Sequence, residues 1–242
     1  AILLSTAIPA SDNPVLTAGI YNTTFSKNTS ESGGAIYTLG DKDNNYINYI
    51  TIQKSNFANN TANKYGGAIY ADRYSVLTII DTNFTNNKAG VTGGAIYING
   101  GSTVSIIAQT QNVTFSGNKA GKASNAIYLN SYYDEGGNLQ KAILNLIAET
   151  GRTITIKDNV DGNGEIYKSG NVVISKTSNL SNITVRDYEG SSSSLIIQRE
   201  SSLKNASLAL GSHSRLNIAN NSIGTLALQN LSLTTSTKLA ID

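Results

Sequence analysis

Cysteine is absent from this chain of 242 residues. Its absence excludes disulfide bonds and thiolate-ligated metal sites, and with them the small secreted scaffolds that disulfides hold together. Charged residues are scarce, at 14% against about 25% in an average soluble protein. The formal net charge is only +2, and no run of Lys or Arg is longer than a pair, so the sequence does not favour a nucleic-acid partner.

Long apolar segments and helical patterns are missing as well. No stretch of about 18 apolar residues occurs, so the sequence predicts no membrane-spanning helix. The segment nearest to a helical pattern, LQKAILNLIAET, has alternating apolar residues at Leu144, Leu146 and Ala148 and is predicted as a strand. Asn, Ser, Thr and Gly replace the missing charges, a composition typical of an extracellular β-rich surface.

What the chain does contain is a repeated motif that uses all four of its phenylalanines. Each begins F-x-x-N, continues eight or nine residues after the Phe with a Gly pair, and ends in Ala-Ile-Tyr. In the fourth copy Ser124-Asn125 replaces the Gly pair. The motif residues are Phe25, Asn28, Gly33 and Gly34; Phe57, Asn60, Gly66 and Gly67; Phe84, Asn87, Gly93 and Gly94; and Phe115 and Asn118.

A weaker fifth copy is ITIKDNVDGNGEIY. It has Ile156 in the place of the Phe, Asn159 in the place of the Asn, and Ile166-Tyr167 at its end. The phenylalanines are separated by 32, 27 and 31 residues, a period that indicates a solenoid. Short alternating runs rich in β-branched residues, such as YITIQ and SVLTII, lie between the motifs and predict strands.

The period has room for about three short strands, which predicts an all-β fold: a single-stranded, right-handed parallel β-helix. We expect each Phe to stack inside the coil on its counterparts, and each Asn to form a ladder at a corner, where it tolerates a left-handed conformation. The Gly pair would supply positive φ at a second corner. In Ala-Ile-Tyr, Ile would lie on one face of the strand and Ala and Tyr on the other.

The coils divide the chain into three parts. Residues 1–20 are predicted to be a cap or first coil, with a capping strand favoured over the remnant of a secretion signal. Residues 21–168 hold the coils with the repeated motif. Residues 169–242 hold shorter Leu- and Ile-rich coils, and because the strand pattern persists to the end, we expect the native protein to continue past Asp242.

The paired F-x-x-N and G-G-A-I motifs from Phe25 to Tyr128 resemble those of the chlamydial polymorphic membrane proteins. Related repeats occur in other bacterial autotransporter passengers and in archaeal adhesin-like proteins. The resemblance implies a surface-exposed adhesin passenger, at the cell surface or outer membrane or secreted, and attached through a C-terminal β-barrel or anchor outside this sequence. The implied partner is a protein or glycan of a host or neighbouring cell, with self-association as a further option; no cofactor and no enzymatic activity are expected.

Two sets of residues are candidates for binding. Tyr37, Tyr70, Tyr97, Tyr128 and Tyr167 would form an aromatic row, which suits sugar rings or partner surfaces but is more often a stack that stabilises the coils. The segments Gly40–Tyr49 and Asn130–Gln140 interrupt the coil length, and such insertions often carry binding. The best candidates for partner contacts are Tyr132, Tyr133, Asp134 and Glu135.

The sequence gives less support to a metal site or a catalytic site than to these binding candidates. Asp41, Asp43, Asn44 and Asn45 are rich in oxygen, as is the segment Asp158–Glu165, but neither has the spacing of an EF-hand or a calcium-binding β-roll. The alternative function, a carbohydrate-active β-helix enzyme, needs acidic residues that converge in one cleft.

The only suggestive grouping is Asp72-Arg73 with Asp81, and the sole histidine, His213, has no catalytic motif around it. A purely structural stalk is the third alternative.

Overall fold

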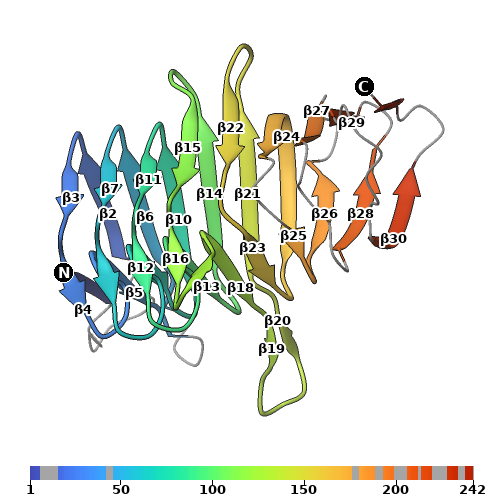
Figure 1. Cartoon of the computed structure of the whole chain (residues 1–242). Coiled ribbons are helices and arrows are strands. Elements are labelled where there is room, and N and C mark those ends of the chain that lie inside the picture. Colours follow the sequence, from blue (N-terminus) through green and yellow to red (C-terminus); the bar gives the residue numbers. More distant parts are fainter. Residues whose placement is uncertain are drawn as a thin grey trace.

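The computed structural model describes residues 1–5, 16–41, 46–175, 180–188, 193–198, 206–211, 214–219, 228–233 and 238–241. This part of the chain is all-β, with parallel strands in stacked sheets (Figure 1). Within the same residues, no helix has the length and hydropathy needed to cross a membrane.

Four groups of strands make up the stack, and we name them sheets A to D. Sheet A consists of β1 (Ile2–Ser5), β5 (Ile36–Leu39), β9 (Ile69–Ala71), β13 (Ile96–Asn99), β18 (Ile127–Asn130), β23 (Val160–Gly162) and β25 (Leu180–Ser181). Sheet B consists of β2 (Leu16–Tyr21), β6 (Asn48–Gln53), β10 (Ser75–Ile80), β14 (Thr103–Ala108), β21 (Ile143–Ala148), β24 (Glu165–Ile174), β26 (Thr184–Asp187), β28 (Ala206–Leu210) and β30 (Leu228–Leu233).

Sheet C consists of β3 (Thr24–Ser26), β7 (Asn56–Ala58), β11 (Asn83–Thr85), β15 (Val113–Ser116), β22 (Thr153–Ile156), β27 (Ser193–Gln198), β29 (Ser214–Ala219) and β31 (Lys238–Ile241). The long strand β24 pairs with strands of both sheet B and sheet C and so joins them. Sheet D consists of β4 (Thr29–Ser30), β8 (Thr61–Ala62), β12 (Lys88–Ala89), β16 (Lys119–Ala120) and β17 (Ala123–Ser124).

The chain passes through sheets B, C, D and A in the same order in its N-terminal coils, and each strand pairs in parallel with its counterpart one coil later. Each of these coils therefore holds four strands, where the sequence predicts about three. The additional one is the strand of sheet D, which has only two residues. A strand this short is too brief to show an alternating pattern.

The interior contains the predicted phenylalanine stack. Phe25, Phe57, Phe84 and Phe115 are buried, and their rings stack with centroids 4.7, 5.0 and 4.8 Å apart and planes within 6° of parallel. Ile156 follows Phe115 in register. The isoleucines of sheet A, such as Ile69 and Ile96, form a second buried row.

The asparagine ladder is also present. Asn87 Nδ2 donates hydrogen bonds to Asn118 Oδ1 (3.0 Å) and to the backbone oxygen of Phe57 (2.9 Å), and Asn60 makes the same pair of bonds one coil earlier. One detail of the prediction is wrong: the Asn does not adopt the left-handed conformation. The residue before it does, as at Asn59 and Asn86, with φ values of 58° and 54°.

Only the first Gly of each pair has positive φ, as at Gly66 with 61°. The second Gly is required for a different reason, because a Cβ at Gly67 would lie 2.1 Å from the backbone oxygen of Gly94 in the next coil. The prediction for Ala-Ile-Tyr is likewise corrected. Ala68 is as fully buried as Ile69, since it precedes the strand and faces the interior from the corner.

The fifth copy of the motif follows a different path from the one predicted. Asp158, not Asn159, continues the ladder, accepting a hydrogen bond from Asn118 Nδ2 at 2.8 Å. Val160, not Ile166, pairs with Ile127 in sheet A. Ile166 and Tyr167 belong to β24 in sheet B. In this coil the chain goes from the Asp158 corner directly to β23 without a strand in sheet D, so the later residues arrive one sheet further on.

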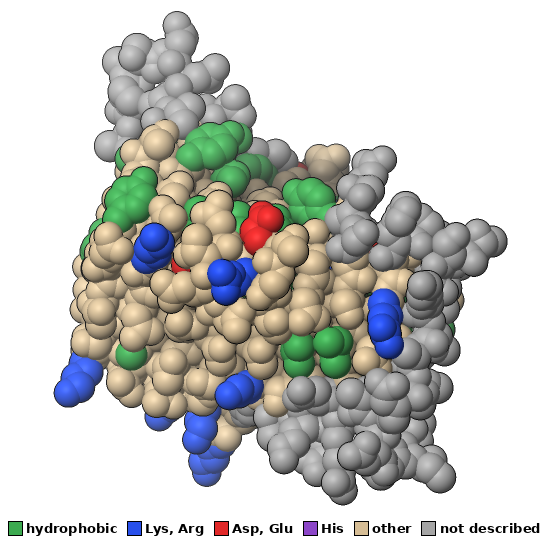
Figure 2. Space-filling view, turned by 90° about the horizontal axis from the view of Figure 1, so that it is seen from above, with side chains coloured by type: hydrophobic (Ala, Val, Ile, Leu, Met, Phe, Trp, Pro, Cys, Tyr) green, Lys and Arg blue, Asp and Glu red, His purple; other side chains and the backbone are tan. Residues whose placement is uncertain are grey.

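After β25 the described strands alternate between sheets B and C. Their inward residues, including Leu195, Leu208 and Leu216, are buried. Leu203, Ile223 and Leu226, which belong to the Leu- and Ile-rich coils predicted from the sequence, lie outside the described residues. The boundary predicted at residue 168 falls within β24. Figure 2 shows a face built mostly of uncharged polar side chains and backbone, with isolated Lys and Arg side chains.

Candidate functional site

The outward face of sheet A carries a row of tyrosines. Tyr37, Tyr70, Tyr97 and Tyr128 are in register, with ring centroids 4.9, 5.0 and 5.6 Å apart. Tyr97 is only 7% exposed, and burial raises the pKa of its hydroxyl above the ordinary value. The row is therefore largely a packed aromatic stack.

Tyr167 is not part of this row. It lies in β24 of sheet B, where its ring contacts that of Tyr188 at a centroid distance of 6.3 Å. The prediction of a five-membered row is therefore wrong at Tyr167. Among the described residues the coil has no strand in sheet D, so Tyr167 lies one sheet further on than predicted.

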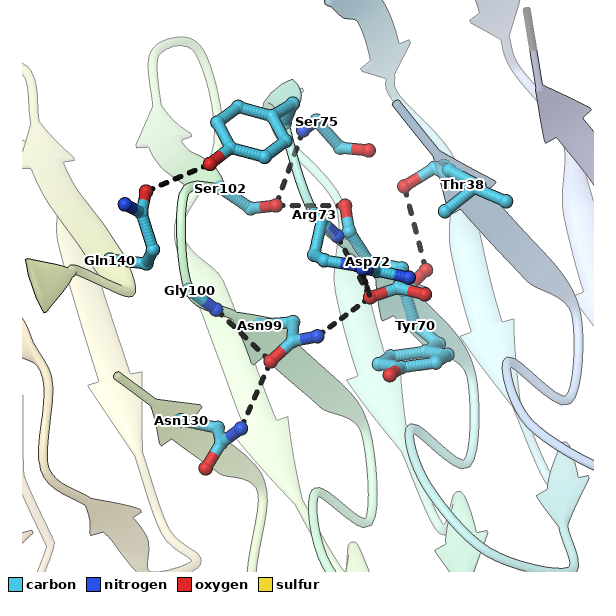
Figure 3. Close-up of polar contacts among 12 residues, drawn as sticks. Thr38, Tyr70, Asp72, Arg73, Ser75, Asn99, Gly100, Ser102, Asn130 and Gln140 are labelled. Carbon is cyan, nitrogen blue, oxygen red and sulfur yellow. Dashed lines mark hydrogen bonds and ion pairs between the residues drawn. The ribbon is translucent and has the colours of Figure 1, made fainter. Parts of the chain in front are cut away.

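A second, polar row lies two residues further along the chain, at the ends of the same strands or just after them. Asn130 Nδ2 donates to Asn99 Oδ1 at 2.9 Å, and Asn99 Nδ2 donates to Asp72 Oδ1 at 2.7 Å (Figure 3). The Tyr37 hydroxyl donates to Asp72 Oδ2 at 2.7 Å. Burial and this bond to Asp72 raise the pKa of Tyr37 above its ordinary value.

Arg73 lies beside this row and reaches into solvent. Its side chain is 56% exposed, and its Nε is 3.9 Å from Asp72 Oδ1, whereas the Asp72 side chain is only 9% exposed. An ion pair this long and this exposed contributes little to stability. The Arg73 guanidinium therefore keeps donors that a ligand can use.

The segment Asn130–Gln140 forms an antiparallel hairpin of β19 (Tyr132–Tyr133) and β20 (Leu139–Gln140), which projects from the stack in Figure 1. Asp134 closes the turn by accepting hydrogen bonds from the Asn138 backbone N–H (2.8 Å) and from Gln140 Nε2 (2.9 Å). The Tyr74 hydroxyl donates to Gln140 Oε1 at 2.8 Å (Figure 3). This bond ties the hairpin to a coil far earlier in the chain.

The hairpin and the edge of the coils enclose a groove with a volume of about 760 Å³. It is lined by Leu39, Gly40, Asp41, Arg73, Tyr74, Tyr132, Tyr133, Asp134, Glu135, Gly136 and Asn138. A second hollow of about 320 Å³ lies beside it, lined by Tyr70, Asp72, Arg73, Asn99, Asn130 and Tyr132. Arg73 and Tyr132 line both, so the two hollows form one candidate site, which we call the hairpin groove.

The hairpin groove brings together residues that the sequence offered as separate sets. Tyr132, Tyr133, Asp134 and Glu135 all line it, and so does Tyr70 from the aromatic row. Tyr97 and Tyr128 do not line it. Tyr37 lies instead with Tyr70 in a third hollow of about 530 Å³.

Sequence reasoning missed the polar row. Its signal was present, because Asp72, Asn99 and Asn130 each follow a motif tyrosine by two residues and so share a face with it.

The residues considered for metal binding and catalysis are dispersed. Asp41 lines the hairpin groove, Asp43, Asn44 and Asn45 lie outside the described residues, and the described chain has no group of three or more His, Cys, Asp or Glu side chains placed to hold a metal. Asp158 belongs to the asparagine ladder. His213 lies outside the described residues.

Asp72 and Asp81 do not share a cleft. They flank β10 at opposite ends, and a strand of its six residues spans ~20 Å. The Asp81 carboxylate accepts hydrogen bonds from the backbone N–H groups of residues 109–111 and from the Thr110 hydroxyl. Asp81 thus caps a turn of the next coil, and the grouping considered for an enzyme is not formed.

The architecture defines a protein of stacked, parallel β coils built from a repeated motif, with a groove at an inserted hairpin. Its motif matches the sequence model of the Chlamydia polymorphic membrane protein repeat over residues 22–39, 54–72 and 81–99. These coils are therefore polymorphic membrane protein-like. No curated protein and no solved structure matches the chain.

Each matched segment begins three residues before the Phe and ends at the last residue of the sheet A strand or, at Asp72, one residue beyond it. The third segment ends at Asn99. The fourth copy, which begins at Phe115, lies outside the matched segments. There Asn125 takes over the place of the second Gly, and its Oδ1 accepts a hydrogen bond from the Gly93 backbone N–H at 2.9 Å.

Proposed function

We propose that this chain is the surface-exposed passenger region of an adhesin of the polymorphic membrane protein type. Its stacked coils would form a right-handed parallel β-helix, because parallel crossover connections are right-handed in about 98% of cases. It would be displayed at the outer membrane or cell surface, or secreted. Its partner would be a glycan or protein on the surface of a host or neighbouring cell.

The observation that carries this proposal is the hairpin groove, which lies beside coils that match the repeat. Tyr132 and Tyr133 offer aromatic surface, Arg73 offers hydrogen-bond donors, and Glu135 is an exposed carboxylate at the rim. A groove with aromatic walls and a few polar groups is the usual form of a ligand site. Its position on a rigid stack favours attachment through many weak contacts when several copies are displayed together.

The proposal can be tested by binding the purified chain to arrays of glycans and matrix proteins. Tyr132→Ala and Tyr133→Ala should each abolish or strongly weaken any binding found. Tyr21→Ala and Tyr49→Ala are matched controls, because these tyrosines are 57% and 43% exposed but lie on sheet B, away from the groove. Equal loss in the controls, or unchanged binding in the groove variants, contradicts the proposal.

A parallel incubation with polysaccharides tests the alternative chemistry. Accumulation of reducing ends or of unsaturated uronates would show that the chain cleaves glycans and would contradict a purely adhesive role. On intact cells of the source organism, labelling by a membrane-impermeant reagent should reach this chain if it is displayed at the surface.

A further inference from the structure

A lysine and an aspartate face each other inside the coils of the C-terminal half. Lys168 in β24 and Asp187 in β26 are cross-strand partners in consecutive coils. The preceding coil has buried Leu146 at the same level. Lys168 is 0% exposed and its Nζ lies 2.5 Å from Asp187 Oδ1, while the side chain of Asp187 is 7% exposed.

Beside its contacts with Asp187 and Ser193, the Lys168 side chain faces apolar residues. The space beside Lys168 is lined by Leu146, Ile166, Val172, Ile174, Leu180, Val185 and Leu195. Burial lowers the pKa of Lys168 below its ordinary value, although its contacts with Asp187 oppose this effect. An ammonium group sealed among these side chains is costly to hold in its charged form.

Two groups of contacts organise the carboxyl of Asp187. On one side, Lys168 Nζ donates to the Ser193 hydroxyl at 2.5 Å, and that hydroxyl donates in turn to Asp187 Oδ1. On the other side, Oδ2 accepts hydrogen bonds from the Gly211 backbone N–H at 2.5 Å and from the Ser214 hydroxyl. One oxygen thus has a proton relay to the amine, and the other has two donors of the kind that stabilise a developing oxyanion.

We propose that Lys168 and Asp187 join in an intramolecular isopeptide bond, a covalent modification that links two consecutive coils.

The reaction is a dehydration. A proton passes from Lys168 Nζ through the Ser193 hydroxyl to Asp187 Oδ1, which converts the ion pair into a neutral amine and a carboxylic acid. The nitrogen lone pair then attacks Cγ, and the electron pair of the C=O bond moves onto Oδ2, where Gly211 and Ser214 donate to it.

The second half of the reaction expels water. Nζ gives up a further proton through Ser193 to the Oδ1 hydroxyl, the Cγ–Oδ1 bond breaks, and Oδ1 leaves as water while the C=O bond to Oδ2 forms again. The three hydrogens of the ammonium group are thereby divided between one amide N–H and one water molecule. No oxidant, metal or cofactor is consumed.

Enforced proximity supplies the driving force. Groups held in contact in the right geometry react as if present at effective concentrations of about 10⁵–10⁸ M, which offsets the unfavourable condensation of a free amine with a free acid in water. Escape of the water from the apolar interior also opposes reversal. The bond would reinforce coils that have no strand in sheet D among the described residues.

The test is the intact mass of the purified wild-type chain. It should be lower than the mass calculated from the sequence by one water molecule. Trypsin should then release residues 158–176 and 187–199 as one joined species, with no cleavage after Lys168. Lys168→Met and Asp187→Ala should both show their full calculated masses, and Ser193→Ala should slow or prevent the loss of water.

Lys141→Met is the matched control. Lys141 makes a similar contact with Glu165, 2.8 Å between Nζ and Oε1, but its side chain is 47% exposed. This variant should lose water as the wild type does. A wild-type chain with its full calculated mass, and with tryptic cleavage after Lys168, would overturn the proposal and leave Lys168 and Asp187 as a buried ion pair.

Discussion

Phe57 and Phe84 lie directly above one another in consecutive coils, with ring planes 4° apart and centroids 5.0 Å apart. Both are fully buried and in register. The ring spacing matches the distance of about 4.8 Å between hydrogen-bonded strands, so the stack fills the interior from one coil to the next. The asparagine ladder holds the same register at the corner.

Removing a ring from the middle of this stack should be costly. Phe84→Ala is expected to destabilise the chain by about 3–5 kcal/mol, because it removes buried apolar surface and leaves a cavity between two rings that cannot close it. Urea unfolding followed by circular dichroism measures the effect. Tyr133→Ala, at a position 71% exposed, should change stability by less than about 0.5 kcal/mol. A small effect of Phe84→Ala would show that the rings do not support the coils.

The asparagine ladder makes a separate prediction. Asn87→Ala removes the acceptor of the Asn60 backbone N–H and the donor to the Phe57 backbone oxygen. Each buried partner left unsatisfied costs about 1–3 kcal/mol. Asn87→Ala should therefore lower the free energy of unfolding several times more than an ordinary surface substitution does. The control is Lys88→Ala at the adjacent exposed position. Equal midpoints of unfolding for the two variants would contradict the role of the ladder.

The second Gly of the pair can be tested by adding a single methyl group. Gly67→Ala places a Cβ 2.1 Å from the backbone oxygen of Gly94, and neither backbone can move without breaking the coil register. We expect misfolding or a large drop in the temperature of unfolding. Gly136→Ala, where the nearest atoms belong to flexible side chains, should be tolerated. Similar unfolding temperatures for the two variants would show that close packing of the coils does not require glycine.

The hydrogen bonds of the Asp81 carboxylate predict that the stability of the fold depends on pH. Burial alone would raise the pKa of its carboxyl, but hydrogen bonds from the Thr110 hydroxyl and from the backbone of residues 109–111 outweigh burial and hold the pKa below its ordinary value. A carboxyl whose pKa is lower in the folded state stabilises the fold above the pKa of the unfolded chain. That stabilisation is lost as pH falls through the folded-state pKa.

Asp81→Asn should therefore destabilise the chain most at neutral pH, and its deficit relative to wild type should shrink below about pH 4. Urea midpoints measured across a pH series test this expectation. Glu135→Gln on the exposed hairpin serves as the control. A deficit of constant size at every pH would contradict the contribution of the Asp81 charge.

The bond between Tyr74 and Gln140 gives a prediction about the hairpin groove. Tyr74→Phe removes the hydroxyl that donates to Gln140 Oε1 and keeps the ring. Hydrogen exchange of residues 132–140 should become faster, while that of the neighbouring strands β14 and β21 should stay unchanged. Tyr49→Phe on sheet B is the matched control. Unchanged exchange in the hairpin would show that other contacts position it.

The motif could be interpreted from the sequence because its signal is local and periodic. Four phenylalanines at a nearly constant spacing, each followed by an Asn, predict stacked coils with an interior ring stack and a corner ladder, since identical residues at identical positions of a coil must lie above one another. The sequence also placed Tyr132–Glu135 in an insertion, because the coil length is interrupted there. These are properties of spacing and alternation alone.

Only the tertiary structure shows the positions of residues that depend on the length of each coil. In the coil after the one that holds Asn118, Asp158 takes the ladder position. Because that coil has no sheet D strand among its described residues, Tyr167 lies in sheet B and not in the aromatic row. The hairpin groove likewise depends on packing that brings Tyr132 and Arg73 into one lining. Residues far apart in the sequence, such as Tyr74 and Gln140, meet through the register between coils. A local pattern does not encode that register, and only the packing of the whole stack determines it.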